Sequence, residues 1–330
     1  MRILQISSAQ SLGGGERHLA DLANGLAQRG HGVYAALRPK SPLREELSNL
    51  PKENLITLPL RNSLDAGSAR DLARVVRQHR IEIVHAHMAR DYPLAAFAVR
   101  RNPDAKLIVT RHVLFPLNRL HRITLAKASR IIAVSQAVAS QLRADQIAPH
   151  EKVTVVLNGI DTRRFQKART AFDREQFLRD WKLPNDRLVV GTVGELTPLK
   201  GHVEFIKAAA RILEHHPNAH FIIAGTDSSR EKKHHQDLSQ LIEQLDLGQR
   251  MTILPWLEDV AQLYCALDIF VSASHTESFG LAIVEAMATG AAVVATSTEG
   301  AQEIIRRDET GLLVPISDVQ SLADAVSGLL

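Results

Sequence analysis

The feature that most constrains this chain is a repeated alternation between short apolar runs and longer amphipathic segments. The runs 2–7, 106–112 and 269–274 are rich in apolar, often β-branched, residues and have the length of a β-strand. Other segments, such as 203–216 and 236–247, carry apolar residues at helical spacing. Apolar strands that alternate with helices are typical of parallel sheets covered by helices on both faces. The sequence therefore predicts an α/β fold with doubly wound parallel sheets.

Length and charge indicate two domains. The chain has 330 residues, more than one hydrophobic core usually serves. A polar, charged stretch near 160–170 interrupts the alternation of strands and helices. Residues 1–165 carry 25 Lys and Arg against 13 Asp and Glu, whereas residues 166–330 carry 15 against 23. We therefore predict domains over 1–165 and 166–330, and we expect the basic half to meet an anionic partner.

Composition also indicates in which cellular compartment the protein is expected. Cys265 is the single cysteine, which excludes an internal disulfide framework and favours a reducing environment. The N-terminal MRILQIS reads directly as a strand and lacks the regions of a signal peptide. The most apolar long segment, 281–295, is interrupted by Glu285, so no membrane helix is expected. We expect a cytoplasmic protein, either soluble or peripheral on the inner face of the membrane.

Three consecutive glycines, Gly13, Gly14 and Gly15, follow the first predicted strand and precede a predicted helix. Glycines let the backbone approach a ligand closely, and a helix N-terminus offers N–H groups to phosphate. Their spacing is not the G-x-G-x-x-G fingerprint of dinucleotide-binding proteins. The segment is therefore either a contact for phosphate or substrate, or simply a tight turn.

Histidines mark the ends of two predicted strands. His112 lies at the carboxyl end of its strand, where α/β sheets bind ligands, although the residues alone favour a histidine at the sheet rim that is bonded to backbone. His85 and His87 alternate on one strand face, but the sequence shows no third and fourth metal ligand nearby. The pairs His215–His216 and His234–His235 lie in polar helical surroundings, and the chain has no D-x-D motif. We therefore expect no metal site.

Lys200 and Gly201 lie in the turn GELTPLKGH between a predicted strand and a predicted helix. A lysine in such a turn suits a diphosphate. A solvated surface lysine is equally consistent with the residues, so the sequence leaves both interpretations open.

The most specific segment is HTESFGLAIVEAMATG, residues 275–290. Glu277 lies in the loop before a predicted helix, where a carboxylate can bind sugar hydroxyls while the helix N-terminus faces a diphosphate. Glu285 lies more than one turn into that helix and can reach a ribose diol. Its apolar neighbours indicate that its carboxylate has a partner. The alternative is two unrelated, solvated acids.

The chain contains, in order, GGGER, IVHAH, VTRH, AVSQAV, LNGIDTRRF, GELTPLKGH, IIAG, the E-x7-E pair and TGLLVP. This ordered set resembles the retaining nucleotide-sugar glycosyltransferases of glycosyltransferase family four over nearly all of the chain. The resemblance implies a GT-B fold of two Rossmann-like domains facing a cleft, with the acceptor on 1–165 and the nucleotide-sugar on 166–330. It also implies retaining transfer from a UDP- or GDP-sugar without a metal or other cofactor.

The resemblance assigns roles residue by residue. It places Gly14 and Gly15 near the donor diphosphate and the acceptor. His112 would contact the donor sugar near the reacting centre, and Lys200 would neutralise the departing diphosphate. These roles make His112 and Lys200 candidate catalytic residues.

In the second half the resemblance implies a donor-binding segment. Glu277 would hold sugar hydroxyls and be the third candidate catalytic residue, and Glu285 would hold the ribose. Phe279, Gly280 and Leu281 would contribute backbone N–H groups.

Two features depart from the family pattern. Glu195 stands where many members have arginine, which replaces a cation near the diphosphate by an acid. It is expected to turn away, to pair with Lys200, or to face a cationic ligand group. The chain ends at SLADAVSGLL, so we expect the C-terminal crossover helices of the family to be absent and domain closure to be looser.

The acceptor is indicated by the segment 117–130. Leu117, Leu120 and Ile123 follow helical spacing there, among the basic residues Arg119, Arg122, Lys127 and Arg130. Such a stretch either rests on an anionic membrane or is an ordinary helix packed on its sheet. We expect a glycan or lipid-linked acceptor, in the synthesis of cell-envelope polysaccharide, lipopolysaccharide or glycolipid.

Other function classes fit the sequence less well. A non-catalytic nucleotide-sugar-binding protein is the alternative that Glu195 and the C-terminus suggest. A dehydrogenase is disfavoured because the G-x-G-x-x-G fingerprint is missing. Nucleic-acid binding is disfavoured because aromatic residues make up only 4% of the chain.

Overall fold

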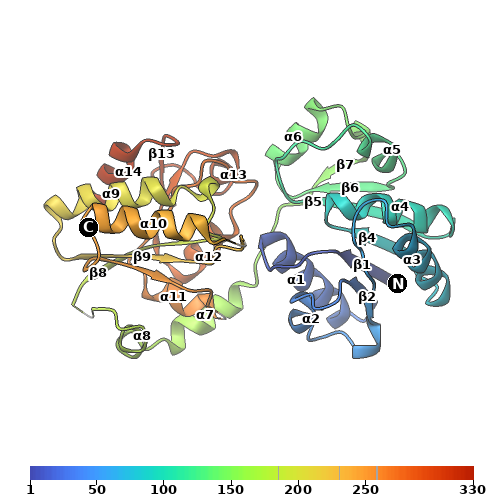
Figure 1. The fold of residues 1–330 in the computed structure, drawn as a ribbon, viewed down its shortest axis with the longest axis horizontal. Coiled ribbons are helices and arrows are strands. Elements are labelled where there is room, and N and C mark those ends of the chain that lie inside the picture. The colour runs from blue at the N-terminus through green and yellow to red at the C-terminus, as the bar shows by residue number, and fades with distance from the viewer. Residues whose placement is uncertain (185, 230, 258) are drawn as a thin grey trace. The chain divides into compact units, whose positions relative to one another are not determined.

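The computed structural model describes residues 1–184, 186–229, 231–257 and 259–330. The chain divides into two compact units, Met1–Asn158 and Gly159–Leu330. Each unit is built on a parallel sheet with helices on both faces (Figure 1). The predicted α/β class with doubly wound parallel sheets is confirmed.

The described residues of the first unit form a seven-stranded sheet in the order β3-β2-β1-β4-β5-β6-β7. Its strands are Arg2–Ser7 (β1), Gly32–Leu37 (β2), Leu55–Thr57 (β3), Ile83–Ala86 (β4), Lys106–Arg111 (β5), Arg130–Ala133 (β6) and Val153–Val155 (β7). Strand β1 pairs with both β2 and β4, so the strand order reverses beside it. The carboxyl edge of a sheet at such a reversal is where α/β folds bind ligands.

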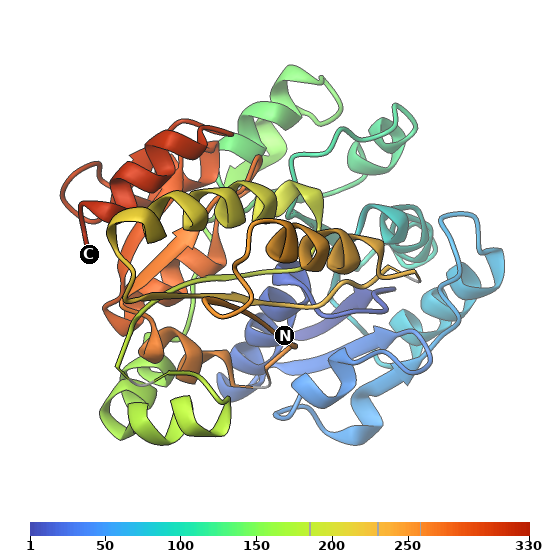
Figure 2. The same ribbon diagram turned by 60° about the vertical axis from the view of Figure 1, so that its left-hand side comes forward.

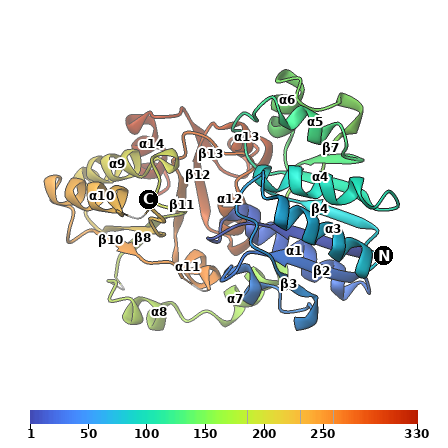
Figure 3. The same cartoon turned by 45° about the vertical axis from the view of Figure 1, so that its right-hand side comes forward.

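Helices cover this sheet by burying one apolar side each. They are Gly14–Gln28 (α1), Leu43–Glu46 (α2), Ala66–Gln78 (α3), Tyr92–Arg100 (α4), His121–Leu125 (α5) and Gln136–Ala144 (α6). Leu19, Ala20 and Ala23 of α1 join a core with β2, because they recur at helical spacing. Helices α3 and α4 pack side by side (Figure 3).

In the second unit, the part of the chain that the structure describes forms a six-stranded sheet in the order β10-β9-β8-β11-β12-β13. Its strands are Leu188–Val193 (β8), Ala219–Ala224 (β9), Met251–Leu254 (β10), Ile269–Ser272 (β11), Ala292–Thr296 (β12) and Leu312–Val314 (β13). Strand β8 pairs with β9 and β11, so the order reverses here too.

The helices of the second unit form two groups, and each group packs in its own apolar core on one face of the sheet. The helices are Thr162–Ala171 (α7), Arg174–Asp180 (α8), His202–His215 (α9), Lys233–Gln244 (α10), Val260–Ala266 (α11), Leu281–Thr289 (α12), Glu299–Ile304 (α13) and Val319–Ser327 (α14). One core joins α9, α10 and α14 to the sheet, with α9 beside α14 (Figure 2). The other joins α7, α8, α11, α12 and α13 to the opposite face. Among the described residues, no helix is both long and apolar enough to span a bilayer.

The division between the units lies earlier than the expected boundary at residue 165. Helix α7 occupies most of the stretch expected to be a linker, and it packs against α11 and α12 of the second unit. The reason is Phe165, which is buried against Tyr264 with the ring centroids 6.3 Å apart. Short edge strands β3 and β13 were also not evident in the sequence, since three residues are too few to show a pattern.

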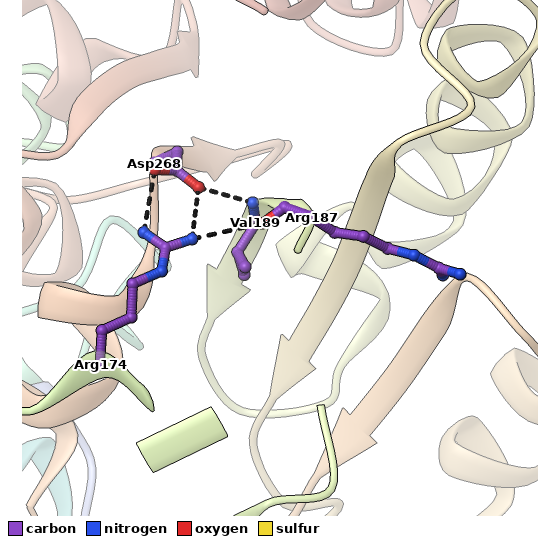
Figure 4. A network of polar contacts seen from close by, with 4 residues as sticks. All are labelled: Arg174, Arg187, Val189 and Asp268. Carbon is purple, nitrogen blue, oxygen red and sulfur yellow. Dashed lines mark hydrogen bonds and ion pairs between the residues drawn. The ribbon is translucent and has the colours of Figure 1, made fainter. Parts of the chain in front are cut away.

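A forked ion pair joins the start of α8 to the start of two strands (Figure 4). The Arg174 guanidinium donates to both carboxylate oxygens of Asp268, at 3.0 and 2.9 Å. One of those oxygens also accepts the backbone N–H of Val189 at 2.7 Å. Asp268 directly precedes β11 and Val189 lies in β8, so one carboxylate fixes the amino ends of two neighbouring strands.

We expect Arg174→Ala to lower the free energy of unfolding by about 1–2 kcal/mol, since it removes a bidentate bond to a partly buried carboxylate. The matched control is Arg179→Ala on the same helix, whose pair with Glu175 is mostly exposed and is worth at most about 0.5 kcal/mol. Urea denaturation of both variants measures the difference. Equal losses in the two variants would contradict the anchoring role of Arg174.

Candidate functional site

Lys200 and Glu277 meet at the carboxyl edge of the second sheet. Lys200 ends a short 3-10 turn, Pro198–Lys200, that follows β8, and Glu277 lies in the loop after β11. Because β8 and β11 are parallel neighbours, their following loops emerge side by side. The Lys200 Nζ donates to a Glu277 carboxylate oxygen at 2.7 Å, with both side chains partly buried. Two residues that are 77 positions apart in the sequence thus form one ion pair.

The turn that carries Lys200 is pressed against the loop after β11. The Leu199 carbonyl accepts the backbone N–H of His275 at 2.8 Å. Gly201 has φ +66°, and a Cβ there would lie 1.8 Å from the Ala273 carbonyl oxygen. Only glycine combines this left-handed conformation with so close a backbone approach. Gly201 therefore sets the position of Lys200 relative to Glu277.

The Glu277 loop is held in the same way on its other side. The Glu277 carbonyl accepts the backbone N–H of Gly300 at 3.0 Å, and a Cβ on Gly300 would come within 2.6 Å of that oxygen. Phe279 is buried. Gly280, with φ +107°, then starts α12 at Leu281. The helix presents first-turn N–H groups and a positive end beside the Lys200–Glu277 pair.

Glu285 has the partner that its apolar neighbours predict. Its carboxylate lies in the middle of α12, is buried, and accepts a hydrogen bond from the Tyr264 hydroxyl of α11 at 2.9 Å. The tyrosine is itself buried, because its ring packs edge-on against Phe270 at 5.6 Å. The sequence did not identify Tyr264; its apolar helix position gives no sign that its hydroxyl reaches a carboxylate.

Glu195 is exposed at the surface of the loop after β8. The Lys200 ammonium instead contacts Glu277. Of the three expectations for Glu195, a pair with Lys200 is the one that this arrangement does not fit. The departure from the family pattern therefore leaves the Lys200–Glu277 pair intact.

In the first unit the glycine loop packs against His112. Helix α1 begins at Gly14, and the Gly13 N–H donates to the Glu16 carboxylate at 3.0 Å. A Cβ on Gly15 would lie 3.4 Å from the His112 ring, which is ordinary contact. His112 directly follows β5, so two of the predicted features lie next to each other at the carboxyl edge of the sheet.

Three more histidines surround this point. His85 lies within β4, His87 directly follows this strand, and His18 lies on the second turn of α1. The His87 Nδ1 and His112 Nε2 atoms are 3.2 Å apart, and the His18 and His112 ring centroids are 4.9 Å apart. The H-x-H pair is evident in the sequence, whereas His18 and the convergence on His112 are not. Histidine at the strand ends and on the first turns of the following helix is the signal that could have revealed it.

Burial keeps this cluster uncharged. It lowers the pKa of His85 and of His112 to about 3, and it lowers the pKa of His87 and His18 as well. Nearby histidines add repulsion to the charged form in His85, His87 and His112. The rings are therefore neutral imidazoles near pH 7, which offer one N–H and one lone pair each.

Two doubly wound units with polar groups at the carboxyl edges of their sheets define the class of GT-B proteins. Two family models agree with this class. The model described as Glycosyltransferase Family 4 matches residues 12–164, and the model described as Glycosyl transferases group 1 matches residues 173–330. The chain belongs to this glycosyltransferase family, as the resemblance predicted.

Individual relatives share part of their length with this chain. It is 33% identical to D-inositol 3-phosphate glycosyltransferase of Mycobacterium ulcerans over 62% of this chain and 43% of the relative. It is 31% identical to the lipopolysaccharide core biosynthesis mannosyltransferase LpsB of Rhizobium meliloti, over 54% of this chain and 50% of LpsB. The chain thus matches about half the length of these relatives or less.

A solved structure covers more of the chain. Anabaena HepE in complex with UDP-glucose is 25% identical, superposes with a TM-score of 0.84, and covers 99% of this chain and 89% of its own.

We expect Gly201→Ala to destabilise the second unit and to separate Lys200 from Glu277, because the new methyl group meets the Ala273 backbone in a strained conformation. Gly248→Ala is the matched control, since a Cβ there meets nothing within 4 Å. Thermal unfolding should show a loss of on the order of several degrees for Gly201→Ala and little change for Gly248→Ala. Two equal melting temperatures would refute this role for Gly201.

Proposed function

We propose that this protein is a retaining glycosyltransferase that moves a sugar from a UDP- or GDP-sugar to a glycan or lipid-linked acceptor. The observation that carries the proposal is the Lys200–Glu277 pair beside the N-terminus of α12. A lysine and helix N–H groups suit a diphosphate, and a neighbouring carboxylate suits sugar hydroxyls. Family membership supplies the reaction class.

The two charged side chains take different parts of the donor. The diphosphate draws the Lys200 ammonium, which stabilises the negative charge that develops as the sugar leaves. Glu277 then exchanges its bond to Lys200 for hydroxyls of the transferred sugar. Phe279, Gly280 and Leu281 contribute main-chain N–H groups at the start of α12. Neither Lys200 nor Glu277 is assigned as a covalent nucleophile, because Lys200 neutralises the diphosphate and Glu277 orients the sugar.

Glu285 binds the ribose hydroxyls of the donor nucleotide. Its hydrogen bond from Tyr264 orients the carboxylate. A buried carboxylate that is already held in place needs little reorganisation when the ribose arrives.

In the first unit, Gly14 and Gly15 let the backbone approach the donor diphosphate and the acceptor. His112 contacts the donor sugar near the reacting centre. Its low pKa makes it a neutral hydrogen-bonding group, so it positions a hydroxyl and supplies no positive charge. Positioning of this kind contributes to the rate by fixing the reacting geometry.

The reaction proceeds without a metal or other cofactor. Lys200 and the N-terminus of α12 supply the positive charge that a metal ion supplies in other nucleotide-sugar sites. Transfer should therefore continue in the presence of EDTA.

The donor and pathway are proposed from relatives. HepE was crystallised with UDP-glucose, which favours a UDP-sugar. LpsB is described as acting in lipopolysaccharide core biosynthesis, which favours a role in cell-envelope lipopolysaccharide, polysaccharide or glycolipid. We propose a cytoplasmic location, either soluble or peripheral on the inner face of the membrane.

A second candidate function is nucleotide-sugar binding without transfer. The observation that favours it is Glu195, an exposed acid close in sequence to the proposed diphosphate site. A thermal-shift screen of UDP- and GDP-sugars followed by transfer and hydrolysis assays separates the two functions, since a bound ligand raises the melting temperature in both cases.

We expect Glu285→Ala to weaken binding of the nucleotide, and Glu277→Ala to lower turnover by about 10²–10³-fold with a smaller effect on binding. Glu243→Ala is the control, because this glutamate is exposed on α10. Calorimetric titration with UDP and steady-state kinetics measure the two effects. If both variants bind and react like the wild type, the assignment of the site is wrong.

The acceptor side has an exposed apolar patch. Phe115, Leu120 and Ile123 expose 56%, 70% and 69% of their surface, and Arg119 and Arg122 lie between them in the sequence and are exposed. Helix α5 covers only His121–Leu125, so the predicted longer amphipathic helix does not form. The exposed side chains favour contact with an anionic membrane over packing on the sheet.

We expect the protein to co-sediment with vesicles that contain anionic lipid more than with neutral vesicles, and less at high salt. The double change Leu120→Ser and Ile123→Ser should reduce this binding, whereas Leu64→Ser, at another highly exposed leucine, should not. Binding that shows no preference for anionic lipid would contradict the proposed contact with an anionic membrane.

A further inference from the structure

The histidine cluster of the first unit has the form of a metal site. His18, His87 and His112 each offer a ring nitrogen, and these three atoms lie within 4.8 Å of one another. They come from α1, the end of β4 and the end of β5, so the fold brings together residues that are 69 and 25 positions apart in the sequence. The cluster as a whole has no role in the proposed transfer, which uses His112 alone.

The spacing of the nitrogen atoms suits one ion. In a tetrahedral zinc site with Zn–N bonds of about 2.0–2.1 Å, two nitrogen ligands lie about 3.4 Å apart. The His87 Nδ1 and His112 Nε2 atoms are already 3.2 Å apart. His18 is partly exposed on the second turn of α1, so a small side-chain adjustment brings its nitrogen to the same distance.

A buried glutamine orients the central ligand. The His87 Nε2 atom lies 2.8 Å from the Gln5 side-chain oxygen, which accepts the ring N–H. Gln5 is fully buried in β1, so this contact is fixed by the sheet. With the N–H on Nε2, His87 presents the Nδ1 lone pair toward His112 and His18. Ring N–H bonds of this kind are a general feature of histidine metal ligands.

His85 is not part of the proposed ligand set. Its Nε2 atom lies 2.7 Å from the Thr110 hydroxyl, inside the sheet. Its ring packs against His87 at 4.1 Å between centroids and so supports the central ligand from behind.

We propose that His18, His87 and His112 bind a divalent transition metal of the zinc class. Three neutral imidazoles favour Zn²⁺, Co²⁺ or Ni²⁺ over the oxygen-preferring Mg²⁺. The fourth position stays open to water. An ion held here occupies a ring nitrogen of His112, the residue that the proposed function assigns to the donor sugar. It therefore inhibits transfer, and this second statement rests on the proposed function whereas metal binding does not.

The first experiment uses Co²⁺ as a spectroscopic probe of the full chain. We expect one Co²⁺ per chain to give the visible absorption of a tetrahedral site, and Zn²⁺ to displace it. His18→Gln should weaken Co²⁺ binding at least about tenfold, and because this side chain is only partly buried the variant should keep its fold by circular dichroism. Gln5→Leu should weaken binding by about 10–100-fold, as loss of an orienting partner does.

His215→Gln is the matched control, because this exposed histidine neighbours His216 and is the kind of surface pair that binds metals weakly. It should leave the tetrahedral absorption unchanged. Absence of that absorption in the wild type, or equal Co²⁺ affinity in the wild type and His18→Gln, would overturn the proposed site.

The second experiment separates the metal site from the proposed reaction. Once a transfer assay is established, Zn²⁺ should inhibit the wild type and EDTA should restore its activity, whereas His18→Gln should resist Zn²⁺. If Co²⁺ binds as expected but no transfer is found with any nucleotide-sugar, the proposed function fails and the metal site stands. If Zn²⁺ at one ion per chain stimulates transfer, the inhibitory role is overturned.

Discussion

The parallel pairing of neighbouring strands within each sheet is the constraint on which the rest of the structure depends. In a parallel pair both carboxyl ends lie on the same edge, so the loops that follow them emerge together. Pairing of β8 with β11 brings Lys200 to Glu277, and pairing of β4 with β5 brings His87 to His112. Burial of the strands on both faces supplies the free energy that holds these polar groups at fixed positions.

The two units stabilise the polar groups at their sheet edges differently. The second unit pairs charges, so that the Lys200 ammonium and the Glu277 carboxylate neutralise each other. The first unit avoids charge, because burial keeps its histidines neutral. A paired charge suits a diphosphate, whereas neutral rings suit hydroxyls or a transition metal. The same fold thus provides two chemically distinct edges.

Several functional features were predictable because local sequence decides them. Apolar runs defined most strands, and glycine at 201 and 280 marked turns that need a left-handed backbone. The sequence missed β3 and β13, since three residues show no pattern. The boundary predicted from the sequence falls within α7. This helix is polar and charged, and Phe165, the residue that packs it against the second unit, does not stand out in its sequence. These differences arise where packing overrides composition.

The sequence by itself determined the α/β class, the two-unit organisation and the family, because periodicity and ordered motifs are properties of the chain. Tertiary structure decided which side chains meet. Lys200 pairs with Glu277, whereas Glu195 stays exposed. Glu285 accepts a hydrogen bond from the Tyr264 hydroxyl, and His18, His87 and His112 lie close together. The physical reason is that these contacts join residues far apart in the sequence, and their distances are set by strand pairing and by close backbone approaches such as that at Gly201.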